Sequence, residues 1–279
     1  MAIKDILLAL KSYPEPTKSI AIEHAVSIAS AIGGHMAAIA CETHVEVPGS
    51  FISSSLINVP AIIAAEAHKS LANAEGSLAT FEAAATKQGL VFESIRERAL
   101  SIEVPAMFAE YARLRDLTIV PVADSDDLWY AESIIFGSGK PTLVLPERAP
   151  SRQFQFGTIV VAWDFSRTAA RAVADAIPLL EKAKNVRIVT ISGEKPIDSK
   201  RSAEELAKNL SRHGIEVVLE KVSSNGREVG EVLESYTQSC NADMLVMGAY
   251  GHSRFREFIL GGATRNLLAK PPLPILFSH

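Results

Sequence analysis

The sequence has few cysteines: Cys41 and Cys240 are the only two among 279 residues. So few thiols exclude a disulfide-stapled scaffold and favour a reducing compartment, so we expect a cytoplasmic protein. No apolar run approaches the roughly 18 residues of a membrane span. The first residues enter an apolar strand pattern at once, which is not typical of a signal peptide. We therefore expect no membrane partner.

An excess of positive charge is also missing. Lysine and arginine number 28 against 32 acidic residues, which gives a net charge of −4. No basic face is implied, so nucleic acid is not an expected partner. Neither a His-Glu-x-x-His nor a Gly-x-Ser-x-Gly motif occurs, so the motif-defined zinc proteases and serine hydrolases are excluded.

The chain is long for one domain and suits two of about 140 residues. Apolar strand patterns and amphipathic helix patterns alternate through it twice. In the first half, strands are predicted over 3–10, 35–41, 91–96, 117–122 and 142–145, with helices over 19–32, 60–88 and 102–114. In the second, strands are predicted over 158–162, 186–191, 215–219, 244–247 and 273–277, with helices over 168–182, 203–213, 227–239 and 263–270.

This alternation predicts an α/β fold in which parallel sheets carry helices on both faces. We expect two tandem, doubly wound, five-stranded domains at residues 1–147 and 157–279, joined by a linker over 147–156. The apolar strands that close each half, 142–145 and 273–277, are predicted to lie at sheet edges and to pair, which makes the chain a pseudo-dimer. Further dimerisation of whole chains is left open. Sheets of this class bind ligands at the carboxyl ends of their strands.

One glycine-rich stretch follows the predicted strand 244–247. Gly248 and Gly251 leave the strand end, and Gly261 and Gly262 open the last predicted helix. Free backbone amides between a strand and a helix N-terminus suit a phosphate. Two tight loops that need glycine for positive φ explain the same residues without a ligand.

The spacing Gly248-x2-Gly251-x9-Gly261, followed by Thr264, resembles the nucleotide-binding signature of the universal stress protein family. One position departs from it, because Gly262 stands where the family's ATP binders usually carry serine or threonine. The resemblance extends to both halves as a tandem pair. It implies a Rossmann-like fold of the adenine nucleotide alpha hydrolase-like kind. It also implies a stress-response regulatory protein without dedicated catalysis, which binds ATP, AMP or another adenine nucleotide, with or without Mg²⁺.

The candidate nucleotide-binding residues lie in the second half. They are Ala162, Asp164, Ile191, Met247, Gly248, Tyr250, Gly251, Ser253, Arg254, Gly261, Gly262, Ala263 and Thr264. Asp164 follows the first strand and could accept from a ribose or an adenine; it could equally stabilise the next helix dipole. The resemblance places Ile191 beside the adenine. Arg254 or Ser253 could supply the phosphate contact that Gly262 lacks.

The first half is predicted to be degenerate for ATP. Lys11 stands where the second half has Asp164, and Val122 and Ser125 are interpreted as the counterparts of Gly248 and Gly251. After Trp129 the spacer and the final helix look shortened. We therefore expect one nucleotide per chain, with another ligand in the first crevice left open.

Three other patterns are interpreted as structural. The run 137–142, Gly-Ser-Gly-Lys-Pro-Thr, is predicted to be a turn, because proline occupies the Mg²⁺-binding position of a phosphate loop. Cys41 and His44 have zinc spacing without a second pair nearby, so no metal site is expected. Asp124, Asp126 and Asp127 are interpreted as a solvated loop, with cation binding as the alternative. A slow ATP hydrolase and a nucleotide-free scaffold with an unknown protein partner remain rival functions.

Overall fold

The computed structural model describes residues 2–44, 59–148, 154–192, 203–249 and 262–279. We call residues up to 148 the N-terminal half and those from 154 the C-terminal half. The strands are β1 (Asp5–Leu10), β2 (His35–His44), β3 (Phe92–Leu100), β4 (Leu117–Val122), β5 (Thr142–Pro146), β6 (Thr158–Ala162), β7 (Asn185–Ser192), β8 (Val217–Ser223), β9 (Met244–Gly248) and β10 (Ile275–Ser278). The helices are α1 (Ser19–Ile32), α2 (Val59–Lys87), α3 (Val104–Arg113), α4 (Leu128–Gly137), α5 (Arg167–Leu180), α6 (Ala203–Ser211), α7 (Val229–Ser239) and α8 (Gly262–Ala269), with a 3₁₀ turn at Ser125–Asp127.

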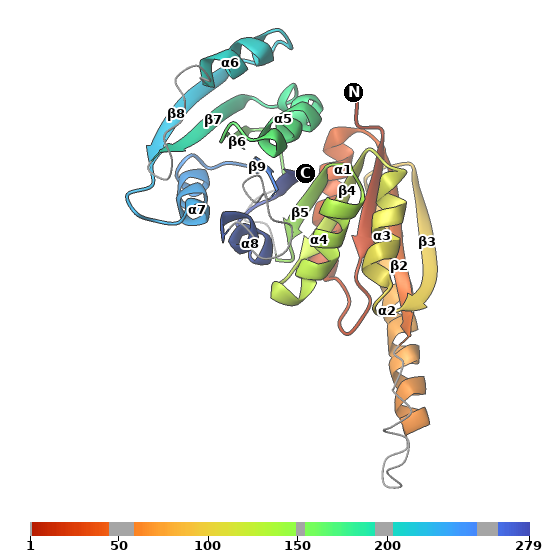
Figure 1. The fold of residues 1–279 in the computed structure, drawn as a ribbon. Coiled ribbons are helices and arrows are strands. Elements are labelled where there is room, and N and C mark those ends of the chain that lie inside the picture. The colour runs from red at the N-terminus through yellow and green to blue at the C-terminus, as the bar shows by residue number, and fades with distance from the viewer. Residues whose placement is uncertain (1, 45–58, 149–153, 193–202, 250–261) are drawn as a thin grey trace.

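All the strands belong to one sheet, ordered β3-β2-β1-β4-β5-β10-β9-β6-β7-β8 (Figure 1). Neighbouring strands are parallel within each half, and β5 and β10 are antiparallel. The central strands are continuous apolar runs because both of their faces are covered. The α/β class is confirmed, and the two predicted five-stranded sheets are joined edge to edge as one.

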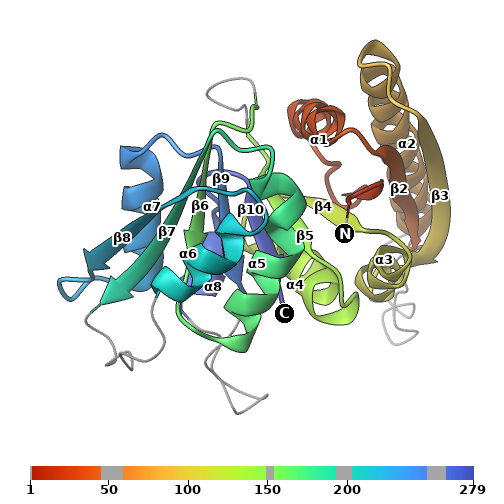
Figure 2. The same ribbon diagram turned by 90° about the horizontal axis from the view of Figure 1, so that it is seen from above.

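Each half is doubly wound. Side chains of α1, α2, α5 and α6 pack into one buried cluster, and those of α3, α4, α7 and α8 pack into the cluster on the other face. Figure 2 shows β3 and α2 at one end of the molecule and β8 and α7 at the other. None of the helices in the described part of the chain has the length and apolar character to cross a membrane.

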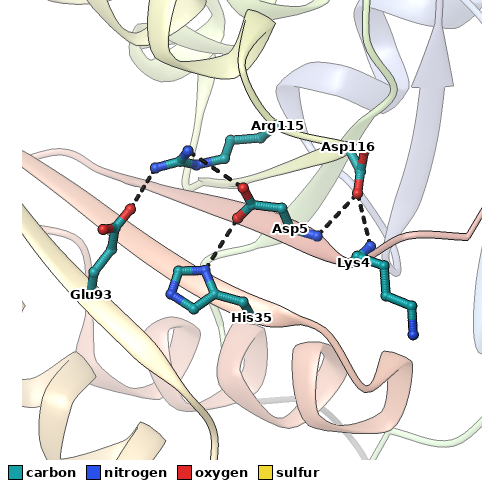
Figure 3. Close-up of polar contacts among 6 residues, drawn as sticks. All are labelled: Lys4, Asp5, His35, Glu93, Arg115 and Asp116. Carbon is teal, nitrogen blue, oxygen red and sulfur yellow. Dashed lines mark hydrogen bonds and ion pairs between the residues drawn. The ribbon is translucent and has the colours of Figure 1, made fainter.

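An aspartate fixes the start of the first strand in both halves, and this shows which residues correspond. In the N-terminal half, Asp116 N donates to Asp5 O at 2.9 Å. Figure 3 shows the second bond, in which Asp116 Oδ2 accepts from Asp5 N at 3.1 Å. In the C-terminal half, Asp243 makes both bonds to Thr158, each at 2.8 Å. Asp116 therefore corresponds to Asp243, and the strand registers carry this correspondence through the sheet.

Figure 3 also shows a charged cluster at the amino ends of β1, β2 and β3. The Arg115 guanidinium lies 3.4 Å from Asp5 Oδ2 and 2.5 Å from Glu93 Oε1, and His35 Nδ1 lies 3.2 Å from Asp5 Oδ1. These contacts tie three strands to the loop before β4. They lie at the end of the sheet opposite to the one where α/β folds bind ligands.

The two halves meet where β5 pairs with β10, which we call the seam. Its register joins Leu143 to Leu276, Thr142 to Phe277 and Val144 to Ile275. By the strand correspondence, Leu143 is the counterpart of Leu276, so a pseudo-twofold axis passes through this pair. The predicted pairing of the closing strands is confirmed.

The prediction of a shortened final helix in the first half was wrong. Helix α4 has 10 residues, against 8 for α8. Its residues Leu128, Ala131, Ile134 and Ile135 are buried at helical spacing. The buried apolar stripe therefore continues to Ile135 and the helix to Gly137, where the sequence predicted a shortened helix.

Candidate functional site

The carboxyl ends of β9, β6 and β7 lie side by side in the C-terminal half. Ala162 ends β6, Ile191 lies near the end of β7, and Met247 lies one residue before the end of β9. All three pack against the cluster on the α7 and α8 face of the sheet. The structure thus brings together three predicted site residues from strands that are far apart in sequence.

Asp164 lies two residues beyond β6 and is exposed. Its Oδ1 accepts a hydrogen bond from Ser166 N at 2.9 Å. Ser166 in turn is the N-cap of α5, because its hydroxyl accepts from Ala169 N at 3.0 Å. Ser166 thus caps α5 with its side chain, and Asp164 lies at the positive end of the α5 dipole.

Gly248 lies against the start of α5. A Cβ at this position would be 2.5 Å from Ala169 N and 2.6 Å from Thr168 Oγ1. The end of β9 can approach the first turn of α5 only because residue 248 has no side chain. This contact joins residues about 80 positions apart, so no local sequence pattern signals it. Ser166 and Thr168 are therefore neighbours of the site that the sequence did not assign to it.

The remaining predicted residues lie at or before the start of α8. Thr264 is buried in this helix, with an exposed fraction of 5%. Gly262 and Ala263 form its first residues. Tyr250, Gly251, Ser253, Arg254 and Gly261 lie outside the described residues. The glycine cradle between β9 and α8 therefore stays a prediction.

The strand registers correct one expected correspondence. Leu7 pairs with Thr118, and Val160 pairs with Leu245, so β4 matches β9 residue by residue. On this register Pro121 corresponds to Gly248, whereas the sequence comparison had placed Val122 there. The error is one residue, because two apolar strands offer no internal landmark for alignment by eye. The register also makes Lys11 the counterpart of Asp164, as expected.

The crevice of the N-terminal half holds an internal ion pair. Lys11 Nζ lies 2.5 Å from Asp127 Oδ1, and the Asp127 side chain is only 5% exposed. Asp127 Oδ2 also accepts from Ala123 N at 2.8 Å. The interpretation of Asp127 as a solvated loop residue was therefore wrong, because its partner is far away in the sequence.

Other titratable groups lie near this ion pair. Glu147 is buried, and its Oε1 accepts from Lys18 N at 2.8 Å. Burial raises the pKa of the Glu147 carboxyl, partly opposed by the Lys18 hydrogen bond and by Lys11. Burial, together with the Asp127 charge, also raises the pKa of Tyr130. Lys11, Asp127 and Tyr130 line a small cavity with Ala9, Phe108, Val120 and Pro121.

The other sequence patterns are structural in the described residues. Cys41 is buried and free, and burial raises the pKa of its thiol to about 11. Gly139 has φ +67° in the bend over 138–140, which confirms the predicted turn there, whereas Gly137 ends α4 and Thr142 begins β5. In the part of the chain that the structure describes, no group of three or more His, Cys, Asp or Glu side chains could hold a metal ion.

Comparisons with known proteins agree with this geometry. Residues 155–279 match the model of the universal stress protein family. A universal stress protein of Synechocystis is 28% identical over 151 residues, an alignment that covers 52% of this chain and 49% of that relative. This chain thus matches about half the length of that curated relative.

Two solved structures share the fold over nearly the whole chain. A universal stress protein from Archaeoglobus fulgidus superposes with a TM-score of 0.69 at 15% identity, covering 98% of this chain and 97% of that one. A protein of unknown function from Pseudomonas aeruginosa gives a TM-score of 0.56 at 13% identity, with 99% and 92% coverage. Residues 155–279 therefore match the universal stress protein family model, and the whole chain shares the fold of a solved universal stress protein.

Proposed function

We propose that the chain is a tandem pair of universal stress protein domains, residues 1–147 and 157–279, and that the second binds one adenine nucleotide. ATP, AMP or a related nucleotide, with or without Mg²⁺, would lie at the carboxyl ends of β9, β6 and β7. The protein would act in the cytoplasm as a stress-response regulator without dedicated catalysis, and the nucleotide would bias its conformation or its binding to a protein partner.

The convergence of Ala162, Ile191 and Met247 on one face of the sheet carries this proposal. Ala162 and Ile191 are partly exposed and Met247 is buried beside them, and apolar side chains on neighbouring strands suit a flat base. The N-terminus of α5 lies beside them, and that of α8 follows β9, so the partial positive charges of two helices are available for phosphates. Asp164 is exposed at this edge, within reach of a ribose or a base.

Calorimetry with ATP, ADP, AMP and cyclic AMP at millimolar concentration tests the proposal. We expect one nucleotide per chain, and we expect Asp164→Ala to weaken binding by about tenfold or more, the effect of losing a charged hydrogen bond. Asp175→Ala is the matched control, because Asp175 lies in α5 and pairs with Arg171 at 2.8 Å. No binding by any of the four nucleotides would refute the proposal. Phosphate release in the same samples would favour a slow hydrolase.

A nucleotide-free scaffold is the second candidate. The packing of Gly248 against Thr168 and Ala169 favours it, because this glycine is required without any ligand. A freshly purified protein without bound nucleotide, shown by mass spectrometry and by the absence of excess absorbance at 260 nm, would support the scaffold. If such a protein binds added nucleotide in the calorimetric titration, the site exists and was empty. If it binds none, the site is absent.

A further inference from the structure

The N-terminal half places a buried carboxylate where the C-terminal half is proposed to bind phosphate. Asp127 is the N-cap residue of α4, the last helix of its half, as α8 is the last helix of the other. Its backbone therefore lies at the positive end of the α4 dipole, a position that favours an anion.

Asp127 uses both carboxylate oxygens in the crevice. Oδ1 pairs with Lys11 Nζ at 2.5 Å, and Oδ2 accepts from the Ala123 amide at 2.8 Å. A backbone amide before a helix and a lysine ammonium are the donors that proteins use for phosphates. Here the donors are already satisfied from within the chain.

The charge is reversed at one matching position of the two crevices. Lys11 corresponds to the exposed Asp164, and it is about one-fifth exposed itself. A second buried carboxylate, that of Glu147, accepts from Lys18 N at the start of α1. Helix α5, the counterpart of α1, is capped instead by the neutral hydroxyl of Ser166.

We propose that the Asp127 carboxylate is a built-in anion of the N-terminal crevice, held by Lys11 and the Ala123 amide, and that it keeps external phosphate-bearing ligands out of this half. The crevice is thus an anion site occupied by its own chain. The crevice needs no external ligand for its stability. The Asp127 carboxylate occupies it whether or not the C-terminal half binds a nucleotide.

Chemical rescue tests this proposal on the full chain. Asp127→Ala removes one carboxylate and leaves space for formate, which has the same charged group. We expect the variant to melt at a lower temperature than the parent, and we expect sodium formate to raise its melting temperature by about 2–4 °C relative to sodium chloride at equal ionic strength. The parent should show no such difference between the two salts.

The double variant Lys11→Met/Asp127→Ala is the control, because it lacks the cation that would hold the formate. Equal effects of formate on the double variant and on Asp127→Ala would overturn the proposal, as would an Asp127→Ala protein as stable as the parent.

If Asp127→Ala does not fold, Asp127→Asn replaces it, because asparagine keeps the shape and the acceptor for Ala123 N. It should melt below the parent, and Lys11→Met added to it should recover part of the loss, since a partly buried ammonium without its carboxylate is then removed. An Asp127→Asn protein with the melting temperature of the parent would contradict the role of the charge.

Discussion

Gly248 shows how one residue can satisfy two explanations. Its place after a strand, in a spacing that resembles a nucleotide signature, predicts a phosphate contact. The structure gives it a packing role as well, because the backbone of Thr168 and Ala169 occupies the space of its absent side chain. The sequence offered a phosphate contact or a positive φ as reasons for glycine here. The φ of Gly248 is not positive, so the second reason is wrong, the first stays a prediction, and the close approach of α5 is a third reason that only the fold shows.

Gly248→Ala should therefore destabilise the protein even without nucleotide. The added Cβ meets backbone atoms at 2.5 Å, which can move only if α5 shifts. We expect a loss of about 1–3 kcal/mol, the usual range for overpacking a core. Urea unfolding in nucleotide-free buffer measures it.

Gly76→Ala is the matched control, because Gly76 lies inside α2 and a Cβ there has no neighbour within 4 Å. Alanine should raise stability there by about 0.5–1 kcal/mol, since glycine is unfavourable within a helix. If Gly248→Ala is as stable as the parent, α5 can shift to accommodate the added Cβ. Ligand binding would then be the remaining explanation for the glycine.

Lys11 and Asp127 mark the limit of sequence-based inference at the scale of residues. That Lys11 replaces the acidic residue of the other half was predictable from the repeat. That Asp127 is buried against it was not, because 116 positions separate the two residues and only the sheet brings them together. Three acidic residues in a short run look solvated whatever their partners are.

At the scale of elements, α4 is the helix of the described residues that the sequence failed to predict in full, whereas the other helices and the strands were predicted. Strands such as β1, β4 and β9 are buried on both faces and appear as unbroken apolar runs. Helix α4 begins with bulky aromatic residues and ends at Gly137, so its pattern resembles a loop with turn residues. Its tertiary packing, against α3 and β4, overrides the weak local preference.

Glu147 joins two elements, because this residue after β5 accepts from the amide of Lys18, the N-cap residue of α1. Burial raises the pKa of this carboxyl above the ordinary value of 4.5. The folded state then holds the proton more tightly than the unfolded chain does. The stability that Glu147 contributes is therefore fully present below about pH 4.5 and is lost as the pH rises through the raised pKa.

Glu147→Gln keeps the acceptor for Lys18 N and stays uncharged at every pH. We expect the unfolding free energy of Glu147→Gln to increase relative to that of the parent as the pH rises from about 4 to about 7. This difference should become constant above the raised pKa of Glu147. Urea unfolding over this range measures the difference. Glu23→Gln, at an exposed position on α1, is the control. If the unfolding free energies of Glu147→Gln and the parent change in parallel with pH, burial does not raise the pKa of this carboxyl.

At the scale of the whole molecule, two parallel half-sheets form one sheet through a single antiparallel contact. A proline precedes each closing strand, at residues 141 and 274, so each strand is short and edge-like in sequence. The pairing satisfies backbone groups that an open edge would expose. Because the register is symmetric about Leu143 and Leu276, each half presents the same surface to the other, as in a twofold dimer.

The seam therefore predicts an energetic coupling between the halves. Leu143 and Leu276 are fully buried and face each other across the seam. Each Leu→Ala change should cost about 2–5 kcal/mol. Since the two side chains share one environment, the double variant should depart from additivity by about 0.5–3 kcal/mol, measured by urea unfolding. Leu143 with Leu210 is the matched pair: Leu210 is also fully buried, but it lies on α6, over the far strands of the other half. The losses of unfolding free energy of Leu143→Ala and Leu210→Ala should add up in their double variant. If the losses of Leu143→Ala and Leu276→Ala also add up, the halves are held together by contacts other than this strand pair.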